Sequence, residues 1–139
     1  MERSAGAVIF HDDSKREFLL LHYESGHWDY VKGHIEKDES EIKTLIRETE
    51  EETGINEGDI KIIEGFREKI QYFYKHEGKL IKKEVVFYLA KSKTKTVTLS
   101  KEHIGFKWLS YEEALKQLTF KNAKEILKNA NSFLKSRLM

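Results

Sequence analysis

The sequence predicts one domain of the α/β class, in which a mixed β-sheet is covered by helices. The length of 139 residues matches a single domain, and no linker, repeat or low-complexity segment divides residues 1–139. Strand-like segments and three helical segments follow one another without regular alternation, a pattern that favours a mixed sheet over a purely parallel one.

The first elements are expected to be strands. Residues 5–10 (AGAVIF) form an apolar run whose small side chains let neighbouring strands approach. Residues 11–14 (HDDS) are typical of a turn, and residues 17–23 (EFLLLHY) predict a second, largely buried strand. Residues 24–32 are a loop or short strand rich in aromatic residues and histidine.

The first helix is predicted over residues 40–53. Asp38 and Glu41 have the spacing of a capping box at its start, and Gly54 follows where a helix C-cap belongs. A core-facing stripe recurs at the helical period and consists of Ile42, Leu45, Ile46 and Thr49.

A hairpin and two further helices complete the prediction. Residues 59–74 alternate loosely, with Gly65 as a bend or bulge, and residues 81–90 return as the partner strand after a turn at residues 76–78. Residues 104–109 predict a last strand. Ser110 and Glu113 form a second capping box, and the helices that follow span residues 111–118 and 121–135.

Composition excludes several function classes. The 25 basic and 24 acidic residues give a net charge of +1, which argues against a protein that binds nucleic acid mainly by bulk charge. The absence of cysteine excludes disulfides, zinc–thiolate sites and cysteine nucleophiles. No signal peptide and no apolar run of about 20 residues is evident, so we expect a cytoplasmic protein without a membrane partner. Nothing marks a dimer interface, and a monomer is the default.

Charge is nevertheless concentrated in one segment. Residues 36–52 carry eight carboxylates and three basic groups, a net charge of −5. At about 100° per residue, Glu48, Glu51 and Glu52 project within roughly 100° of one another, beside the apolar stripe. Such clustering destabilises a helix unless a cation neutralises it, and Mg²⁺ prefers carboxylate oxygens while keeping waters and substrate phosphates as further ligands. A solvated glutamate-rich helix face is the alternative explanation.

The spacing within this segment supplies a more specific signal. Residues 33–55, GHIEKDESEIKTLIRETEEETGI, resemble the Nudix box, G-x5-E-x7-R-E-U-x-E-E-x-G-U, where U is a bulky apolar residue. Thr49 replaces one apolar residue, and the prolines common in this loop are absent. The fixed positions are filled by Gly33, Glu39, Arg47, Glu48, Glu51, Glu52, Gly54 and Ile55.

The resemblance implies an α/β/α sandwich and a hydrolase of nucleoside diphosphates linked to another group. It implies that Glu48, Glu51 and Glu52 ligate Mg²⁺, with Mn²⁺ as a possible substitute, and that the Gly33 carbonyl joins them. By the same resemblance Glu39, Arg47 and Gly54 are structural residues of the box.

A wider resemblance covers nearly the whole chain. Segments 4–10, 27–28, 32–34, 64–66, 102–103 and 108–109 are similar to the asymmetrically cleaving diadenosine tetraphosphate hydrolases. The subfamily implies that His27 and Lys32 contact phosphates and that Glu102 assists the metals or the attacking water. Aromatic residues near the nucleotide would be Tyr23, Tyr72 and Phe120, the last standing where some members carry tyrosine. Further cationic candidates are Lys79, Lys82 and Lys83.

The expected reaction is Mg²⁺-dependent hydrolysis of diadenosine tetraphosphate to ATP and AMP, with a small dinucleoside polyphosphate as the partner and no obligate nucleic acid. Glu52 is expected to be catalytic through the metal, and either Glu48 or Glu102 would accept the proton of the attacking water. Alternative substrates are another nucleoside polyphosphate, an oxidised nucleotide, ADP-ribose or an RNA 5′-triphosphate. A third hypothesis is a non-catalytic nucleotide-binding module. The presence of every glutamate of the box argues against it.

Overall fold

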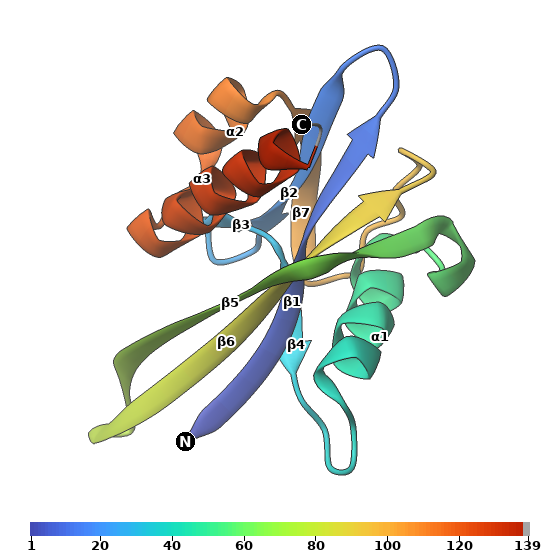
Figure 1. Cartoon of the computed structure of the whole chain (residues 1–139). Coiled ribbons are helices and arrows are strands. Elements are labelled where there is room, and N and C mark those ends of the chain that lie inside the picture. The colour runs from blue at the N-terminus through green and yellow to red at the C-terminus, as the bar shows by residue number, and fades with distance from the viewer. Residues whose placement is uncertain (138–139) are drawn as a thin grey trace.

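A computed structural model describes residues 1–137 and places β1 (Glu2–Asp12) at the centre of a seven-stranded mixed sheet (Figure 1). β1 runs parallel to β6 (Lys79–Ser92) and antiparallel to β2 (Arg16–Tyr23) and β4 (Val31–His34). β5 (Ile60–His76) pairs with β6 in a long hairpin that projects from the body of the molecule.

Two short strands complete the sheet beside β2. β3 (Trp28–Asp29) and β7 (His103–Leu109) both pair antiparallel with β2. The main path through the sheet is therefore β3-β2-β1-β6-β5, with β4 on β1 and β7 on β2.

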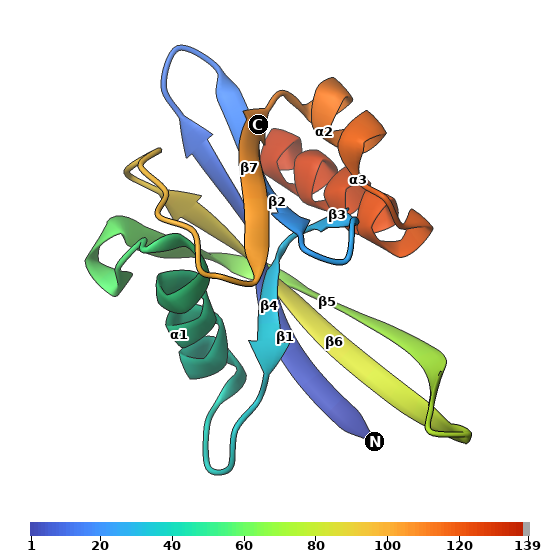
Figure 2. The same ribbon diagram turned by 180° about the vertical axis from the view of Figure 1, so that it is seen from behind.

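Helices cover both faces of the sheet (Figures 1 and 2). α1 (Glu41–Thr53) lies on one face, followed by a short 3-10 turn, η1 (Glu57–Asp59). α2 (Tyr111–Gln117) and α3 (Lys121–Ser136) lie on the other face. This arrangement confirms the predicted α/β/α sandwich with a mixed sheet.

Alternation along β1 divides the core between these two layers. Val8 packs in the cluster that includes Leu127 of α3, whereas Ile9 packs in the cluster that includes Leu45 of α1. Successive side chains of a strand point to opposite faces, so one strand supplies both cores. All four side chains are at most 1% exposed.

The start of α1 differs from the sequence-based expectation. Ser40 is the N-cap residue, and its side chain accepts a hydrogen bond from the Lys43 backbone N–H (3.1 Å). The predicted capping role of Asp38 is wrong, because Asp38 lies in the preceding turn with φ of 64°. The end of the helix is as predicted, since Gly54 is left-handed with φ of 75° and donates to the Glu50 carbonyl.

The other local signals are confirmed. The β5–β6 register shifts between Ile62 and Arg67, and Gly65 in this bulge has φ of 100°. Ser110 caps α2 by accepting from the Glu113 backbone N–H (3.3 Å). Within residues 1–137, every helix is too short or too polar to cross a membrane.

Candidate active site

A cleft of about 590 Å³ lies between α1, β4 and the segment that leads into β7. Figure 2 shows α1 beside β4, with that segment passing the end of the helix. The cleft brings together charged residues that are far apart in the sequence, and the Gly33 backbone also lines it. Its carboxylates and cations include Glu48, Glu51, Glu52 and Glu102 together with Lys32, Lys83 and Lys101.

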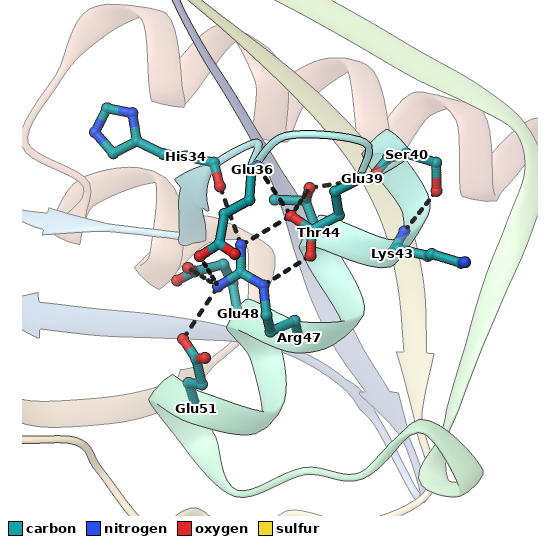
Figure 3. Close-up of polar contacts among 9 residues, drawn as sticks. All are labelled: His34, Glu36, Glu39, Ser40, Lys43, Thr44, Arg47, Glu48 and Glu51. Atoms are coloured by element: carbon teal, nitrogen blue, oxygen red, sulfur yellow. Dashed lines mark hydrogen bonds and ion pairs between the residues drawn. The ribbon is translucent and has the colours of Figure 1, made fainter.

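Arg47 organises the entrance to this cleft (Figure 3). Its guanidinium donates two hydrogen bonds to Glu39, through Nε (2.8 Å) and Nη2 (2.9 Å), and a third to the His34 carbonyl (3.0 Å). Nη1 contacts Glu48 Oε1 (2.8 Å) and Glu51 Oε2 (3.3 Å). A planar fork of five donors suits this task better than an ammonium group, so Arg47 fixes two of the candidate ligands.

Glu39 closes the loop that precedes α1. In addition to Arg47, it accepts hydrogen bonds from the Thr44 hydroxyl (2.6 Å) and the Glu36 backbone N–H (3.1 Å). The Arg47 guanidinium is the main reason that the pKa of Glu39 falls to about 2. An ionised Glu39 therefore ties the loop to the helix.

Gly33 makes room for the Glu48 carboxylate. A Cβ atom at residue 33 would lie 2.0 Å from Glu48 Cδ and 2.3 Å from both carboxylate oxygens, separations at which real atoms collide. Glycine is required on β4 because the carboxylate of α1 packs directly against its backbone.

Glu52 is the most buried acid of the cleft, with only 3% of its surface exposed. Burial, followed by the neighbouring Glu48 carboxylate, raises its pKa to about 10. Within residues 1–137, neither carboxyl oxygen of Glu52 has a hydrogen-bond donor in suitable geometry. His103 Nε2 lies 3.2 Å from Glu52 Oε1 and also lacks an aligned partner.

These residues fit a hard divalent cation. The Glu48 carboxylate lies against the Gly33 backbone, and the unpartnered Glu52 oxygens belong to the same cleft. Oxygen donors of this kind suit Mg²⁺ or Mn²⁺. Among the described residues, His, Asp and Glu do not form a closed cluster of three or more. Instead the carboxylates line an open cleft, which leaves coordination positions for water and phosphate.

The segment 97–102 reaches the cleft because it caps the end of α1. The Thr98 N–H donates to the Thr53 carbonyl (2.8 Å), and the Ser100 N–H donates to the Glu52 carbonyl (3.3 Å). The last carbonyls of a helix have no partner within the helix, so these bonds satisfy them and hold Glu102 at the opening.

A second cavity of about 310 Å³ adjoins the cleft through Lys32, which lines both. Tyr72 of β5 and Phe120 at the start of α3 line it, together with Asp29 and Lys121. Lys32 is held by Asp29 at 3.0 Å. The cavity therefore offers aromatic surface at one side and a cation at its junction with the carboxylates.

An aromatic column connects the two cavities. Phe120 lies 5.2 Å from the His27 ring, His27 stacks on Tyr23 at 4.5 Å, and Tyr23 meets the edge of His103 at 4.4 Å. Tyr23 donates to the Tyr30 carbonyl (2.6 Å), which fixes the middle of the column. His27 thus lies between the aromatic cavity and the carboxylates.

Residues 1–130 match the NUDIX domain family. The chain belongs to the Nudix family. It is 39% identical over 143 aligned residues to the bis(5′-nucleosyl)-tetraphosphatase (asymmetrical) of Sus scrofa, with 95% of each chain covered. The Caenorhabditis elegans protein of that name is 37% identical and covers 95% of this chain and 96% of its own.

Solved structures agree with this Nudix assignment. The crystal structure of a C. elegans Ap4A hydrolase binary complex superposes with a TM-score of 0.87 at 35% identity, covering 98% of this chain and 99% of that one. The Escherichia coli dihydroneopterin triphosphate pyrophosphohydrolase, at 18% identity and a TM-score of 0.76, shares the fold over 91% and 92% of the two chains.

The structure brings most of the predicted site residues of this Nudix domain together, and three of the predicted substrate-binding residues line neither cavity. One of these is His27, although its ring lies between Tyr23 and Phe120. Lys79 and Lys82 are absent from the lining of both cavities, whereas Lys83 lines the acidic cleft. Lys83 pairs with Tyr72 across the hairpin, and Lys82 pairs with Phe73 on the opposite face. Strand register therefore turns Lys82 away from the site, whereas Lys79, on the same face as Lys83, pairs with His76 at the end of the hairpin.

Sequence reasoning missed the contributions of Asp29, Lys121 and His103. Asp29 follows the segment 27–28, and Lys121 follows Phe120, but neither residue belongs to a recognisable motif. His103 has no sequence signal that separates it from a surface histidine, and only the packing of β7 shows that it is buried against Glu52.

We expect Gly54→Ala to lower the free energy of unfolding by about 1–2 kcal/mol. Alanine is disfavoured at φ of 75°, and its Cβ would lie 3.3 Å from Thr98 Cβ. Because Thr98 belongs to the segment that carries Glu102, activity should fall as well. Urea denaturation measures the change, with Gly58→Ala as control, since no atom lies within 4 Å of its Cβ position. Equal stability of the two variants would contradict the capping role.

Proposed function

We propose that this Nudix protein hydrolyses dinucleoside tetraphosphates asymmetrically, cleaving diadenosine tetraphosphate to ATP and AMP. Relatives that align over nearly their whole length carry this activity in their names. The observation that carries the proposal is the junction at Lys32, where an aromatic cavity meets a carboxylate cleft. This arrangement suits a ligand that has a base at one end and a long phosphate chain.

Mg²⁺ is the proposed cofactor, with Mn²⁺ as a substitute, and Glu48, Glu51, Glu52 and the Gly33 carbonyl would hold it. When bound, such a cation neutralises phosphate charge and lowers the pKa of the attacking water. Glu102 would contribute from the opposite side of the cleft. A cytoplasmic location and a monomeric state remain predictions.

The chain's own cations and aromatic residues would orient the substrate. Lys32 and Lys83 line the cleft and offer ammonium groups to phosphate oxygens, and His27 stands between the cavities. Tyr72 and Phe120 would hold the base, since stacking on an aromatic ring contributes about 1–3 kcal/mol. Positioning and charge neutralisation are the main requirements of phosphoryl transfer.

Glu102 is the better candidate for the proton acceptor. Glu48 accepts a hydrogen bond from Arg47 (2.8 Å), packs on Gly33 and is also assigned to the cation, so fewer of its lone pairs are available to accept a proton. Among residues 1–137, the Glu102 side chain has no ion pair, and it lies at the exposed edge of the cleft. A carboxylate in that position can accept a proton from a bound water.

Product analysis tests this function. The protein would be incubated with Mg²⁺ in ¹⁸O water and a panel of dinucleoside polyphosphates, ADP-ribose, oxidised nucleoside triphosphates and 5′-triphosphorylated RNA. We expect ATP and AMP, with the highest kcat/KM on the tetraphosphate. Two ADP molecules from diadenosine tetraphosphate would contradict asymmetric cleavage, and a preference for another member of the panel would contradict the substrate.

We expect Tyr72→Leu to raise KM for diadenosine tetraphosphate about 10-fold with little change in kcat, because leucine keeps the apolar packing but removes the stacking surface. Phe73→Leu is the matched control, because Phe73 is the next residue on the strand, lies on its other face and is 60% exposed. Steady-state kinetics measure both. An equal effect of the two substitutions would argue against a base at Tyr72.

A further inference from the structure

His103 is a buried histidine that the reaction outlined above does not use. It is the first residue of β7, it pairs with Tyr23 of β2, and its backbone N–H donates to the Ser100 carbonyl (3.3 Å). Its side chain is fully buried (0% exposed). The ring is therefore held in place by the strand and by the loop before it.

Both ring nitrogens face polar groups. Nδ1 lies 3.0 Å from the Ser100 hydroxyl, and Nε2 lies 3.2 Å from Glu52 Oε1. The distance to Glu52 is within hydrogen-bonding range, but the alignment is imperfect, and both atoms lack another partner among residues 1–137. Buried polar atoms without partners are rare in native proteins, so this pair calls for an explanation.

The position of the imidazole proton follows from the partners. A neutral ring carries one N–H. The Ser100 hydroxyl, which accepts from the Glu102 backbone N–H (3.4 Å), can still donate its own hydrogen to Nδ1, whereas an ionised Glu52 can only accept. The ring proton then belongs on Nε2, facing Glu52. The other tautomer would direct a lone pair at the carboxylate, which is unfavourable once a cation holds Glu52 ionised.

We propose that His103 is a positioning residue that donates an Nε2–H hydrogen bond to Glu52 and so holds that carboxylate in its cation-binding orientation, with Ser100 setting the tautomer. Partners of this kind orient carboxylate ligands and raise metal affinity. The role rests on the proposed function only in assigning Glu52 to the cation. His103 also connects the segment of Glu102 to Glu52, since the Ser100 hydroxyl contacts both the His103 ring and the Glu102 backbone N–H.

Two substitutions separate the hydrogen bond from the packing. The side-chain amide nitrogen of His103→Gln can occupy the place of Nε2, whereas that of His103→Asn can occupy only the place of Nδ1. We expect His103→Asn to weaken Mn²⁺ binding about 10–100-fold and His103→Gln to weaken it less than about 3-fold. Free Mn²⁺ is measured by electron paramagnetic resonance without substrate, with thermal denaturation as the check on folding.

Two further variants complete the design. His11→Gln is the matched control, because His11 is a part-buried histidine that contacts the Ser92 carbonyl and lines neither cavity. It should bind Mn²⁺ like the wild type. Ser100→Ala frees the tautomer without changing the ring, and about a 3-fold loss of affinity is expected. This variant decides the matter if the His103 variants fail to fold.

Three outcomes would overturn the role. Wild-type Mn²⁺ affinity in His103→Asn or in Ser100→Ala would show that the hydrogen bond does not hold Glu52. Equal losses of Mn²⁺ affinity in folded His103→Gln and His103→Asn would show that ring packing causes the effect. An electron spin echo signal of directly bound ¹⁴N would make His103 a ligand. Failure of the proposed function can be distinguished from failure of the His103 role. In that case the wild type would not turn over diadenosine tetraphosphate, but the variants would still differ in Mn²⁺ affinity.

Discussion

Glu52→Gln should lower kcat about 1000-fold, the equivalent of about 4 kcal/mol of transition-state stabilisation. Glutamine keeps the shape of this buried side chain but removes the negative charge that would hold the cation. Turnover of diadenosine tetraphosphate at saturating Mg²⁺ measures the loss. Glu50→Gln is the control, because Glu50 lies on the same helix, is exposed and is absent from the lining of the cleft. A Glu52→Gln enzyme within 10-fold of wild type would contradict the ligand role.

The same substitution gives a second readout in metal-free protein. Because the pKa of Glu52 is raised from 4.5 to about 10, the folded state retains a proton that the unfolded state loses above pH 4.5. This contribution is fully present below pH 4.5 and is lost as the pH rises toward about 10, by up to about 1.4 kcal/mol per pH unit.

Glu52→Gln should remove this slope, so that its melting temperature exceeds that of the wild type at pH 8, by about 2–5 °C per kcal/mol. Added Mg²⁺ should stabilise the wild type increasingly with pH, because the cation displaces the proton. Parallel curves of stability against pH for the two proteins between pH 5 and 9 would show that Glu52 does not cause the pH dependence of stability.

Local signals in the sequence were sufficient where neighbouring residues decide the structure. Gly54 ends α1, Gly65 sits in the β5 bulge, and Ser110 begins α2, each through the conformation or capping bond that its residue type favours. Thr49 fits the apolar stripe of α1 because its hydroxyl donates to the Leu45 carbonyl (2.6 Å), which satisfies the buried oxygen.

Features that depend on register or on distant contacts were beyond the sequence. Asp38 and Ser40 are both good caps by composition, and the choice depends on how the preceding loop is tied to Arg47 through Glu39. Lys82 and Lys83 are equivalent in a sequence, but a shift of one residue on a strand reverses the face. His103 is buried only because β7 adds to β2.

The near-neutral total charge does not reveal that the site contains groups of opposite charge, because these groups come from distant parts of the chain. The acidic helix contributes Glu48, Glu51 and Glu52, whereas the lysines of the cleft come from β4, β6 and the segment before β7. Composition can exclude binding by bulk charge, but only the fold shows that cations and carboxylates converge where a polyphosphate chain with its metal would need both.

Gly33→Ala should lower kcat/KM about 100-fold while the protein remains folded. The new Cβ would lie 2.0 Å from Glu48 Cδ, so the carboxylate must move away from β4. Because a displacement of about 1 Å at a catalytic centre can cost 100-fold in rate, the loss should be large. The displaced atoms end a side chain in an open cleft, so the structure can yield there without unfolding.

The comparison that isolates this effect uses Mn²⁺ affinity, kinetics and thermal denaturation on Gly33→Ala and Gly58→Ala. Gly58 has open space around its Cβ position, so its variant should match the wild type in all three measurements. For Gly33→Ala we expect a nearly unchanged melting temperature with weakened Mn²⁺ binding. Unchanged affinity and rate would show that Glu48 does not need the backbone of β4 beside it, and a collapse in stability would assign Gly33 to strand pairing.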